Sequence, residues 1–342
     1  MQFSSAELAW AAGVVGRRVP PTPQYVWPLL ADDVGAEVWV KHENHTPTGA
    51  FKVRGGLVYA ERLRTGRPEV KGIVSATRGN HGQSLAFAGR AAGLGVTIVV
   101  PEGNSPGKNA AMRGFGAELI VYGHDYQAAR EHAGALGAER GLEIVPAYHP
   151  DLVLGVATYA RELFDAAGEL DTVYVPVGMG SGISGIIGVR DLLGLRTEVV
   201  GVVAQEAPAT ARSVAAGRVV ATDTASTFID GVACRVPDAG AISVICAGAA
   251  RVLTISEDDA AEAMRVLFAA THNVAEPAGA LALAGLLAER SQAAGKRVAV
   301  IQTGGNADAG LLLQVLAGHT PAVGGPPAGR TGSRTRAGCR ES

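Results

Sequence analysis

Hydrophobic and polar positions alternate with two different periods along most of the chain. Short apolar or alternating runs have the pattern of strands, and the segments between them have the spacing of helices with one apolar face. The runs that we expect to form strands are 37–43, 72–76, 96–100, 117–122, 172–177, 198–204 and 297–302. The segments that we expect to form helices are 5–15 (with Ser4 or Ser5 as its N-cap), 82–93, 108–115, 126–140, 184–193 and 257–273, with a further helix opening at Glu276.

This succession predicts an α/β fold. Repeated strand–helix–strand units form parallel sheets with right-handed crossovers, and the helices cover the faces of the sheets. With 342 residues, the chain is long enough for two domains and a substantial core. The periodicity stops after Gly318, and residues 319–342 are rich in Pro, Gly and Arg, so we expect them to form a disordered tail.

Composition limits the classes of partner. A formal net charge of −2 gives no reason to expect nucleic acid, and no apolar stretch approaches the length needed to span a bilayer. Cys234, Cys246 and Cys339 are widely spaced and form neither a metal-ligand pattern nor a disulfide framework. Because the first residues also lack the features of a secretion signal, we expect a cytoplasmic protein that acts on a small molecule.

The predicted chemistry centres on Lys52. This lysine follows the turn Thr-Pro-Thr-Gly at 46–49 and precedes a helical pattern, so it is expected at a strand–turn–helix junction among small residues. A lysine in that position can be held over a flat cofactor. If it is to form an imine, its amine needs a lowered pKa, which burial can provide.

The stretch from Lys41 to Gly55 resembles the Schiff-base lysine motif of the fold-type-II pyridoxal phosphate enzymes, the tryptophan synthase β-like family. Within that family it most resembles the serine/threonine dehydratases, and the resemblance extends from about residue 22 to residue 316. It implies pyridoxal 5′-phosphate as the cofactor and Lys52 as the catalytic residue that binds it covalently, with Phe51 next to the cofactor.

The same resemblance implies an architecture. It predicts two open, mostly parallel twisted sheets flanked by helices, with a small domain inserted into a larger one and the cofactor in the cleft between them. In this chain the large, cofactor-binding domain would comprise residues 1–52 and 148–318, and the small domain residues 53–147. A homodimer or homotetramer is expected on the same ground.

A second motif lies between an expected strand and an expected helix, where backbone amides bind anions well. It resembles the family's Ser-x-Gly-Asn-His-x-Gln loop, in which the Asn side chain contacts the 3′-oxygen of the cofactor. Asn80 inherits that role. Thr77, Arg78, Gly79 and His81 are expected around the substrate carboxylate, with the His81 imidazole in a structural role.

Arg78 departs from the family pattern, which usually has Ser or Ala before Gly-Asn. In relatives resembling serine racemase, a serine at this position is the acid or base on the second face of the substrate. An arginine stays protonated and is a poor base, which disfavours racemisation. Arg78 either pairs with a second substrate carboxylate, as in 3-hydroxyaspartate, or makes a structural salt bridge.

A third motif follows the expected strand 172–177 and has the form of a phosphate cradle at the start of a helix. It lacks the third glycine of a dinucleotide-binding fingerprint. It matches the family's tetraglycine loop, although two of the glycines are replaced. Backbone amides are the expected ligands, so the substitutions should preserve binding. The residues of this cradle are Gly178, Met179, Gly180, Ser181 and Gly182.

Two further residues complete the expected cofactor site. Thr303, in Thr-Gly-Gly-Asn after the last expected strand, matches the family residue whose hydroxyl faces the pyridine nitrogen. A hydroxyl cannot hold that nitrogen protonated as a carboxylate would, which suits β-elimination. Glu276 matches a family segment near the ring, and Asp230 with Gly231 matches a turn that we expect to be structural. The divalent-ion site of serine racemase-like members is not expected, because Arg212 stands where the second acidic residue would be.

The sequence thus predicts a pyridoxal phosphate-dependent ammonia-lyase that converts L-threonine and/or L-serine to a 2-oxo acid and ammonia by α,β-elimination of water. Lys52 is the expected base that removes the α-proton. The alternatives are a 3-hydroxyaspartate dehydratase, an amino-acid racemase and a threonine synthase-like β-replacement enzyme. Which 3-hydroxy amino acid is preferred does not follow from the sequence.

Overall fold

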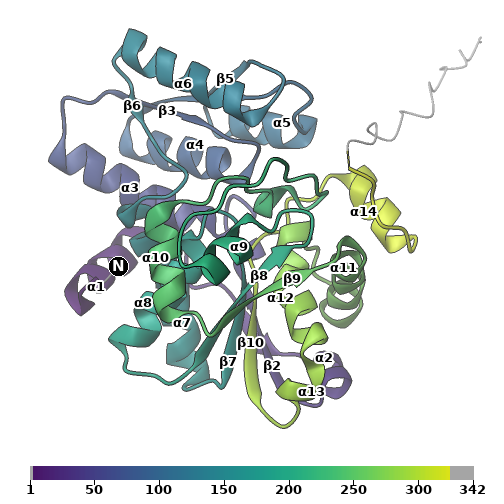
Figure 1. The fold of residues 1–342 in the computed structure, drawn as a ribbon. Helices are drawn as coiled ribbons and strands as arrows, with labels where there is room; N and C mark the ends of the chain where they lie inside the picture. The colour runs from purple at the N-terminus through teal and green to yellow at the C-terminus, as the bar shows by residue number, and fades with distance from the viewer. Residues whose placement is uncertain (1–2, 324–342) are drawn as a thin grey trace, which may run out of the picture.

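A computed structural model describes residues 3–323. Its larger sheet has six strands in the order β1-β2-β10-β7-β8-β9, and only the edge pair β1–β2 is antiparallel (Figure 1). The carboxyl ends of the parallel strands meet at one edge, where ligands bind in open α/β sheets. The strands are β1 (Gln24–Val26), β2 (Glu37–His42), β10 (Arg297–Gln302), β7 (Thr172–Pro176), β8 (Glu198–Ala204) and β9 (Arg251–Ile255).

The smaller sheet has four strands in the order β5-β4-β3-β6, and all of its pairs are parallel. All four strands come from the segment between β2 and β7, so this sheet interrupts the larger one along the chain. Figure 1 shows it beside the larger sheet, with its own helices around it. The strands are β3 (Gly72–Ala76), β4 (Gly95–Val100), β5 (Glu118–Val121) and β6 (Glu143–Ile144).

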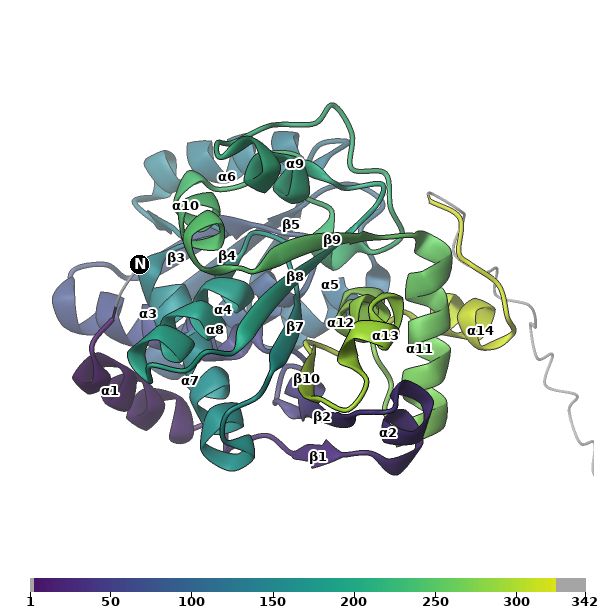
Figure 2. The same cartoon turned by 60° about the horizontal axis from the view of Figure 1, so that its bottom comes forward.

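Helices cover the faces of both sheets. In the larger sheet, α12 lies on one face and α8 on the other, and a separate apolar core fills each side (Figure 2). The helices are α1 (Ser5–Gly16), α2 (Pro28–Val34), α3 (Lys52–Gly66), α4 (Asn80–Ala92), α5 (Pro106–Gly114), α6 (Tyr126–Arg140), α7 (Pro150–Ala167), α8 (Ser181–Leu192), α9 (Ala209–Ala216), α10 (Ala239–Gly248), α11 (Glu257–Thr271), α12 (Pro277–Ala288), α13 (Arg290–Ala293) and α14 (Ala309–Leu316).

The predicted α/β class with two mostly parallel sheets is confirmed. Each expected strand and helix occurs, with ends that differ from the prediction by up to three residues. The division into residues 1–52 and 148–318 around a small domain of 53–147 stays a prediction. The predicted disordered tail lies outside the described residues from residue 324 onward.

The sequence pattern missed several elements, and α7 is the longest of them. Its side chains from Leu152 to Ala160 are all buried, against α1, α3 and α8, so polar positions that mark a helical period occur only in its second half. The strands β1 and β6 were missed because they are only three and two residues long. Within residues 3–323, every helix is too short or too polar to cross a membrane.

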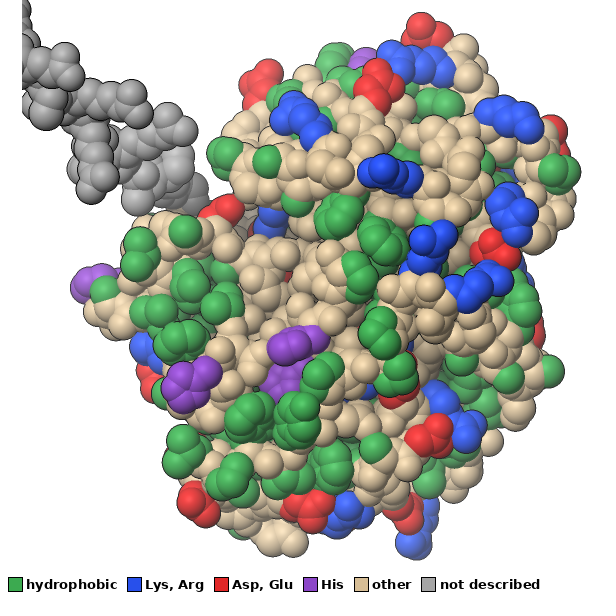
Figure 3. Space-filling model, turned by 180° about the vertical axis from the view of Figure 1, so that it is seen from behind, with side chains coloured by type: hydrophobic (Ala, Val, Ile, Leu, Met, Phe, Trp, Pro, Cys, Tyr) green, Lys and Arg blue, Asp and Glu red, His purple; other side chains and the backbone are tan. Residues whose placement is uncertain are grey.

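Side chains of both charges are interspersed over the face seen in Figure 3, and several histidines lie there among apolar side chains. The rings of Trp27, just before α2, and His42, at the end of β2, have centroids 5.7 Å apart. Trp27 donates from Nε1 to Nε2 of His42, so this imidazole is part of a packed cluster. Burial lowers the pKa of His42 to about 4, which keeps it neutral at ordinary pH.

Candidate active site

The predicted site residues lie where four helices begin. Lys52, Asn80 and Ser181 are the first residues of α3, α4 and α8, and Glu276 is the N-cap of α12. Thr303 directly follows β10 in the larger sheet, whereas Asn80 comes from the loop after β3 in the smaller one. The amino ends of helices present free N–H groups and a positive dipole, which suits a cofactor with a negative phosphate.

Lys52 is a partly buried residue at the start of α3. Its Nζ lies 3.1 Å from the hydroxyl of Ser181 and 5.0 Å from the centre of the Phe51 ring. Burial lowers the pKa of Lys52 to about 8. A substantial share of the amine is therefore unprotonated near neutral pH, as attack on an aldehyde or removal of a proton requires.

A buried ion network supports the first turn of α3. The guanidinium of Arg54 donates to both carboxylate oxygens of Glu43, at 2.8 and 2.9 Å, and also to Glu162 at 2.6 and 2.9 Å. Lys41 donates to the same Glu162 at 2.6 Å. Arg54, Glu43 and Lys41 are fully buried, so each charge depends on its partners.

Hydrogen bonds join the lysine turn to the segment after β10. Gly49 has a φ of +68°, which favours glycine at this turn, and its carbonyl accepts from Gly305 N–H at 2.9 Å. The N–H of Phe51 donates to the Thr303 carbonyl at 3.0 Å. Backbone hydrogen bonds therefore fix the lysine turn to the Thr-Gly-Gly-Asn motif after β10.

The Asn80 side chain is held from both ends. Its Nδ2 donates to Oε1 of Glu276 at 2.5 Å, and its Oδ1 accepts from Nδ2 of Asn306 at 2.8 Å. Asn306 also donates to the carbonyl of Thr48 at 2.8 Å, so its side chain connects the lysine turn, the Asn80 loop and its own segment after β10. Asn306 ends the Thr-Gly-Gly-Asn motif, and its role was not predicted from the sequence.

Glu276 is buried and only half paired. Oε1 accepts from Asn80, whereas Oε2 has no hydrogen-bond partner among the described residues. Burial raises the pKa of Glu276, although the ammonium of Lys108, 4.0 Å from Oε2, acts in the opposite direction. A buried polar atom without a partner is uncommon and marks a position where a ligand can bind.

Lys108 is a site residue that was not predicted from the sequence. Its Nζ contacts Oδ2 of Asp230 at 2.5 Å, and a Cβ on Gly79 would lie 3.5 Å from Nζ. Burial alone would lower the pKa of Lys108, but the carboxylates of Asp230 and Glu276 outweigh it and raise the pKa. The sequence feature that could have revealed Lys108 is its position in the first turn of α5, where the helix dipole disfavours a cation. Asp230, which we expected to be purely structural, is thus an ion-pair partner at the site.

The loop expected to bind the substrate carboxylate has a buried part and an exposed part. Thr77 is buried, and its hydroxyl accepts from the N–H of Gly79 at 3.1 Å. The His81 imidazole is also buried, and burial lowers its pKa to about 3, so it is neutral. Arg78 is exposed and makes no ion pair with any residue from 3 to 323, which leaves its guanidinium able to meet a ligand.

The glycine-rich loop closes tightly against the segment at Asp230. A Cβ at Gly178 would lie 2.6 Å from the carbonyl oxygen of Gly231. Gly180 has a φ of +96° and forms the N-cap of α8. The Met179 side chain instead packs toward Cys234, with 3.5 Å between the two sulfur atoms. This packing suits a loop whose backbone amides are the expected ligands of an anion.

These residues fit a flat cofactor that carries an aldehyde and a phosphate. The glycine loop offers backbone amides at the start of α8, and the Lys52 amine lies next to Ser181, the first residue of that helix. The hydroxyl of Thr303 is buried and makes only a long contact of 3.4 Å with the Ala278 carbonyl. Within residues 3–323, no three His, Cys, Asp or Glu side chains are grouped as a metal site.

Comparison with known proteins identifies the class. Residues 16–304 match the family described as "Pyridoxal-phosphate dependent enzyme". The chain is 31% identical over 310 residues to the L-threo-3-hydroxyaspartate ammonia-lyase of Saccharomyces cerevisiae, covering 90% of this chain and 94% of that one. It is 29% identical over 303 residues to the serine racemase of Schizosaccharomyces pombe, covering 88% and 94%.

Among solved structures, the processed form of threonine deaminase isoform 2 from Solanum lycopersicum superposes with a TM-score of 0.84 at 26% identity, covering 92% of this chain and 94% of that one. The chain therefore belongs to the pyridoxal phosphate-dependent enzyme family of fold type II, and its relatives include ammonia-lyases. Its cofactor is pyridoxal 5′-phosphate, as the sequence predicted. These relatives differ in substrate and reaction, so the particular activity has to be argued from the site.

Proposed function

We propose that the protein is an ammonia-lyase that converts L-threonine and/or L-serine to a 2-oxo acid and ammonia by α,β-elimination of water. The observation that carries this proposal is the amine of Lys52, whose pKa is lowered to about 8 next to the glycine loop. An amine with such a pKa can act as a base near neutral pH. The bound cofactor supplies an electron sink for the electrons that the departing α-proton leaves behind.

Each group of residues has a role in this proposal. The glycine loop from Gly178 to Gly182 holds the cofactor phosphate, and the Thr303 hydroxyl faces the pyridine nitrogen. Asn80, held by Glu276 and by the amide of Asn306, orients the ring. The backbone between Thr77 and His81 binds the substrate carboxylate at the start of α4.

Elimination is favoured over racemisation by the residue at position 78. Racemisation needs a second group that exchanges protons on the opposite face of the substrate. A guanidinium remains protonated at any ordinary pH, so Arg78 cannot serve as that group. Arg78 is exposed and makes no ion pair in the described part of the chain, so its guanidinium is available to bind an anion.

A second candidate substrate is 3-hydroxyaspartate, which follows the same chemistry but carries another carboxylate. Arg78 favours it, because an unpaired guanidinium beside the carboxylate-binding loop can make a two-pronged bond to a second carboxylate. One relative, the yeast protein described above as a 3-hydroxyaspartate ammonia-lyase, carries this substrate in its name.

The experiment compares 2-oxo acid release from L-threonine, L-serine and L-threo-3-hydroxyaspartate by the cofactor-loaded protein and by Arg78→Ala. Arg113→Ala is a matched control, because Arg113 is also exposed and without an ion pair among residues 3–323. For a threonine/serine enzyme, Arg78→Ala changes kcat/KM for threonine less than about threefold. A loss of about tenfold or more, confined to hydroxyaspartate, would instead assign that substrate to Arg78.

We further propose that the enzyme works as a homodimer or homotetramer, as the family resemblance implies, and that it works in the cytoplasm, as its widely spaced cysteines indicate. Light scattering on the purified protein measures the mass directly. A single species at the mass of one chain would contradict the oligomer.

A further inference from the structure

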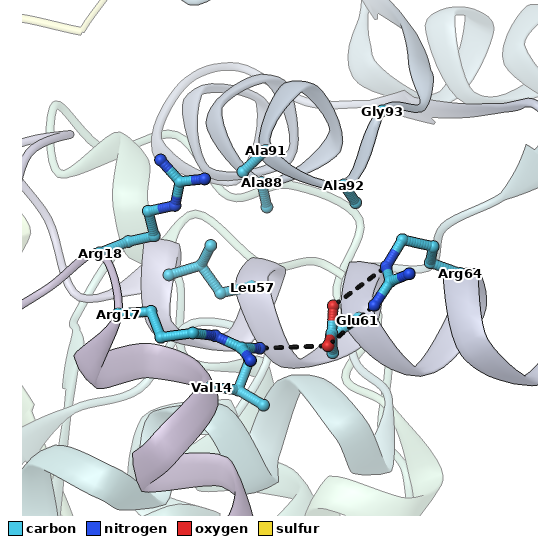
Figure 4. A pocket seen from close by; sticks show the side chains of 10 residues that line it. All are labelled: Val14, Arg17, Arg18, Leu57, Glu61, Arg64, Ala88, Ala91, Ala92 and Gly93. Atoms are coloured by element: carbon cyan, nitrogen blue, oxygen red, sulfur yellow. Dashed lines mark hydrogen bonds and ion pairs between the residues drawn. The ribbon is translucent and has the colours of Figure 1, made fainter.

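A second charged cavity lies apart from the lysine site, between α1, α3 and α4. It has a volume of about 570 Å³, within the range of small-molecule pockets. Figure 4 shows its polar wall, which consists of Arg17, Arg18, Arg64 and Glu61. None of these residues belongs to the site described above.

The positive charge of this wall is only partly neutralised. Oε1 of Glu61 accepts from Nη2 of Arg17 at 3.1 Å and from Nη2 of Arg64 at 3.1 Å. Arg18 makes no ion pair with any residue between 3 and 323. Two guanidinium groups therefore share one carboxylate, the third has none, and all three keep N–H donors that the carboxylate does not use. Three positive charges against one negative charge leave the wall with a formal charge of +2.

The rest of the cavity is apolar. Val14, Leu57 and Ala88 line it with side chains that are almost fully withdrawn from solvent. Ala91 and Ala92 extend this surface toward the end of α4. A ligand that used the whole cavity would combine an anionic group for the arginines with a compact apolar body for these residues.

We propose that this cavity binds a small organic dianion, namely a phosphate monoester with a compact apolar body. A dianion matches the excess charge of the wall, and guanidinium groups bind phosphate oxygens through paired hydrogen bonds. This proposal goes beyond the function proposed above and needs no substrate to be tested.

The cavity is also placed to influence the lysine site. It is lined by the later residues of α3 and α4, and these two helices begin at Lys52 and Asn80. A ligand there would join α1 to both helices. Because it would bind only the folded protein, it would raise the thermal stability, and this effect would grow with the logarithm of the ligand concentration once the site is nearly full.

The test uses the cofactor-loaded protein, in which the cofactor already occupies the phosphate cradle at α8. Phenyl phosphate is titrated by calorimetry, with inorganic phosphate and neutral benzyl alcohol as comparisons. We expect one phenyl phosphate per chain, weaker binding of inorganic phosphate and no binding of benzyl alcohol. Arg18→Ala and Arg64→Ala should each weaken binding about tenfold, whereas Arg130→Ala, an exposed arginine of α6, should leave it unchanged.

A second variant tests the charge without removing an arginine. Ala91 is exposed on α4, so Ala91→Glu should leave the fold intact while it adds a carboxylate at the cavity. We expect it to abolish binding of phenyl phosphate. The proposal is overturned if phenyl phosphate does not bind, or if it binds Arg18→Ala, Arg64→Ala and Ala91→Glu as tightly as the native protein. The arginines would then only compensate the negative ends of α1 and α3.

Discussion

The reactivity of the Lys52 amine should follow its environment and can be measured without substrate. Burial lowers the pKa of Lys52 from 10.5 to about 8. At pH 7.5 an ordinary lysine is about 0.1% unprotonated, whereas a lysine with a pKa of 8 is about 24% unprotonated, a difference of roughly 200-fold. The burial of this one side chain thus provides most of the reactivity that attack on the cofactor aldehyde requires.

The assay follows the visible absorbance that appears when cofactor-free protein binds pyridoxal phosphate covalently. Only the unprotonated amine reacts, so the rate should rise with pH and level off above a midpoint near pH 8. In Ser181→Ala the midpoint should stay within about half a unit, because burial rather than the hydroxyl contact causes the shift. A rate that keeps rising toward pH 10.5 would refute this reasoning, since the amine would then titrate as if it were in water.

Three further predictions concern the supports of the site. Glu43→Gln should lower the free energy of unfolding in urea by about 3–5 kcal/mol, because it removes a carboxylate that pairs with a buried guanidinium. The control Asp165→Asn, in an exposed ion pair, should lower it by less than about 1 kcal/mol. Equal costs would contradict this. Gly178→Ala should weaken cofactor binding and destabilise the fold by about 1–3 kcal/mol, because its Cβ would collide with a carbonyl oxygen, whereas Gly134→Ala, in an open helix position, should be slightly stabilising. If Gly178→Ala changed neither cofactor binding nor stability, the loop would have room for a Cβ and the prediction would be wrong. Because the pKa of Glu276 is raised in the fold, its carboxyl contributes stability that falls as pH rises above 4.5, so Glu276→Gln should become more stable relative to the native protein between pH 5 and pH 8. Parallel pH curves would refute this.

Much of the fold could be predicted because its strands and helices carry local signals. Val-rich runs such as β7 and β8 are buried on both faces, and their pattern clearly predicts strands. Ser4 was one of the two predicted N-caps of α1, and its capping box with Glu7 is formed. In contrast, the first half of α7 is an unbroken buried run from Leu152 to Ala160, and charged positions follow it only from Arg161 onward.

The composition of the site was only partly predictable. Lys52, Asn80 and Thr303 were predicted from motifs in which each residue has a set place, and the structure brings all three to helix starts or strand ends of the candidate site. Lys108 and Asp230 come from segments 122 positions apart, and only the packing of the two sheets brings them together. Their contact is a property of the tertiary structure, and a lysine in the first turn of α5 was the only local sign of it.

The most direct test of the proposed activity measures all products that the cofactor-loaded protein forms from L-threonine. We expect equal amounts of 2-oxo acid and ammonia, no D-threonine or D-allothreonine by chiral chromatography, and no product from Lys52→Ala. Release of an epimerised amino acid without 2-oxo acid would make the protein a racemase. Undiminished 2-oxo acid release by Lys52→Ala would contradict the central role assigned to the amine at the start of α3.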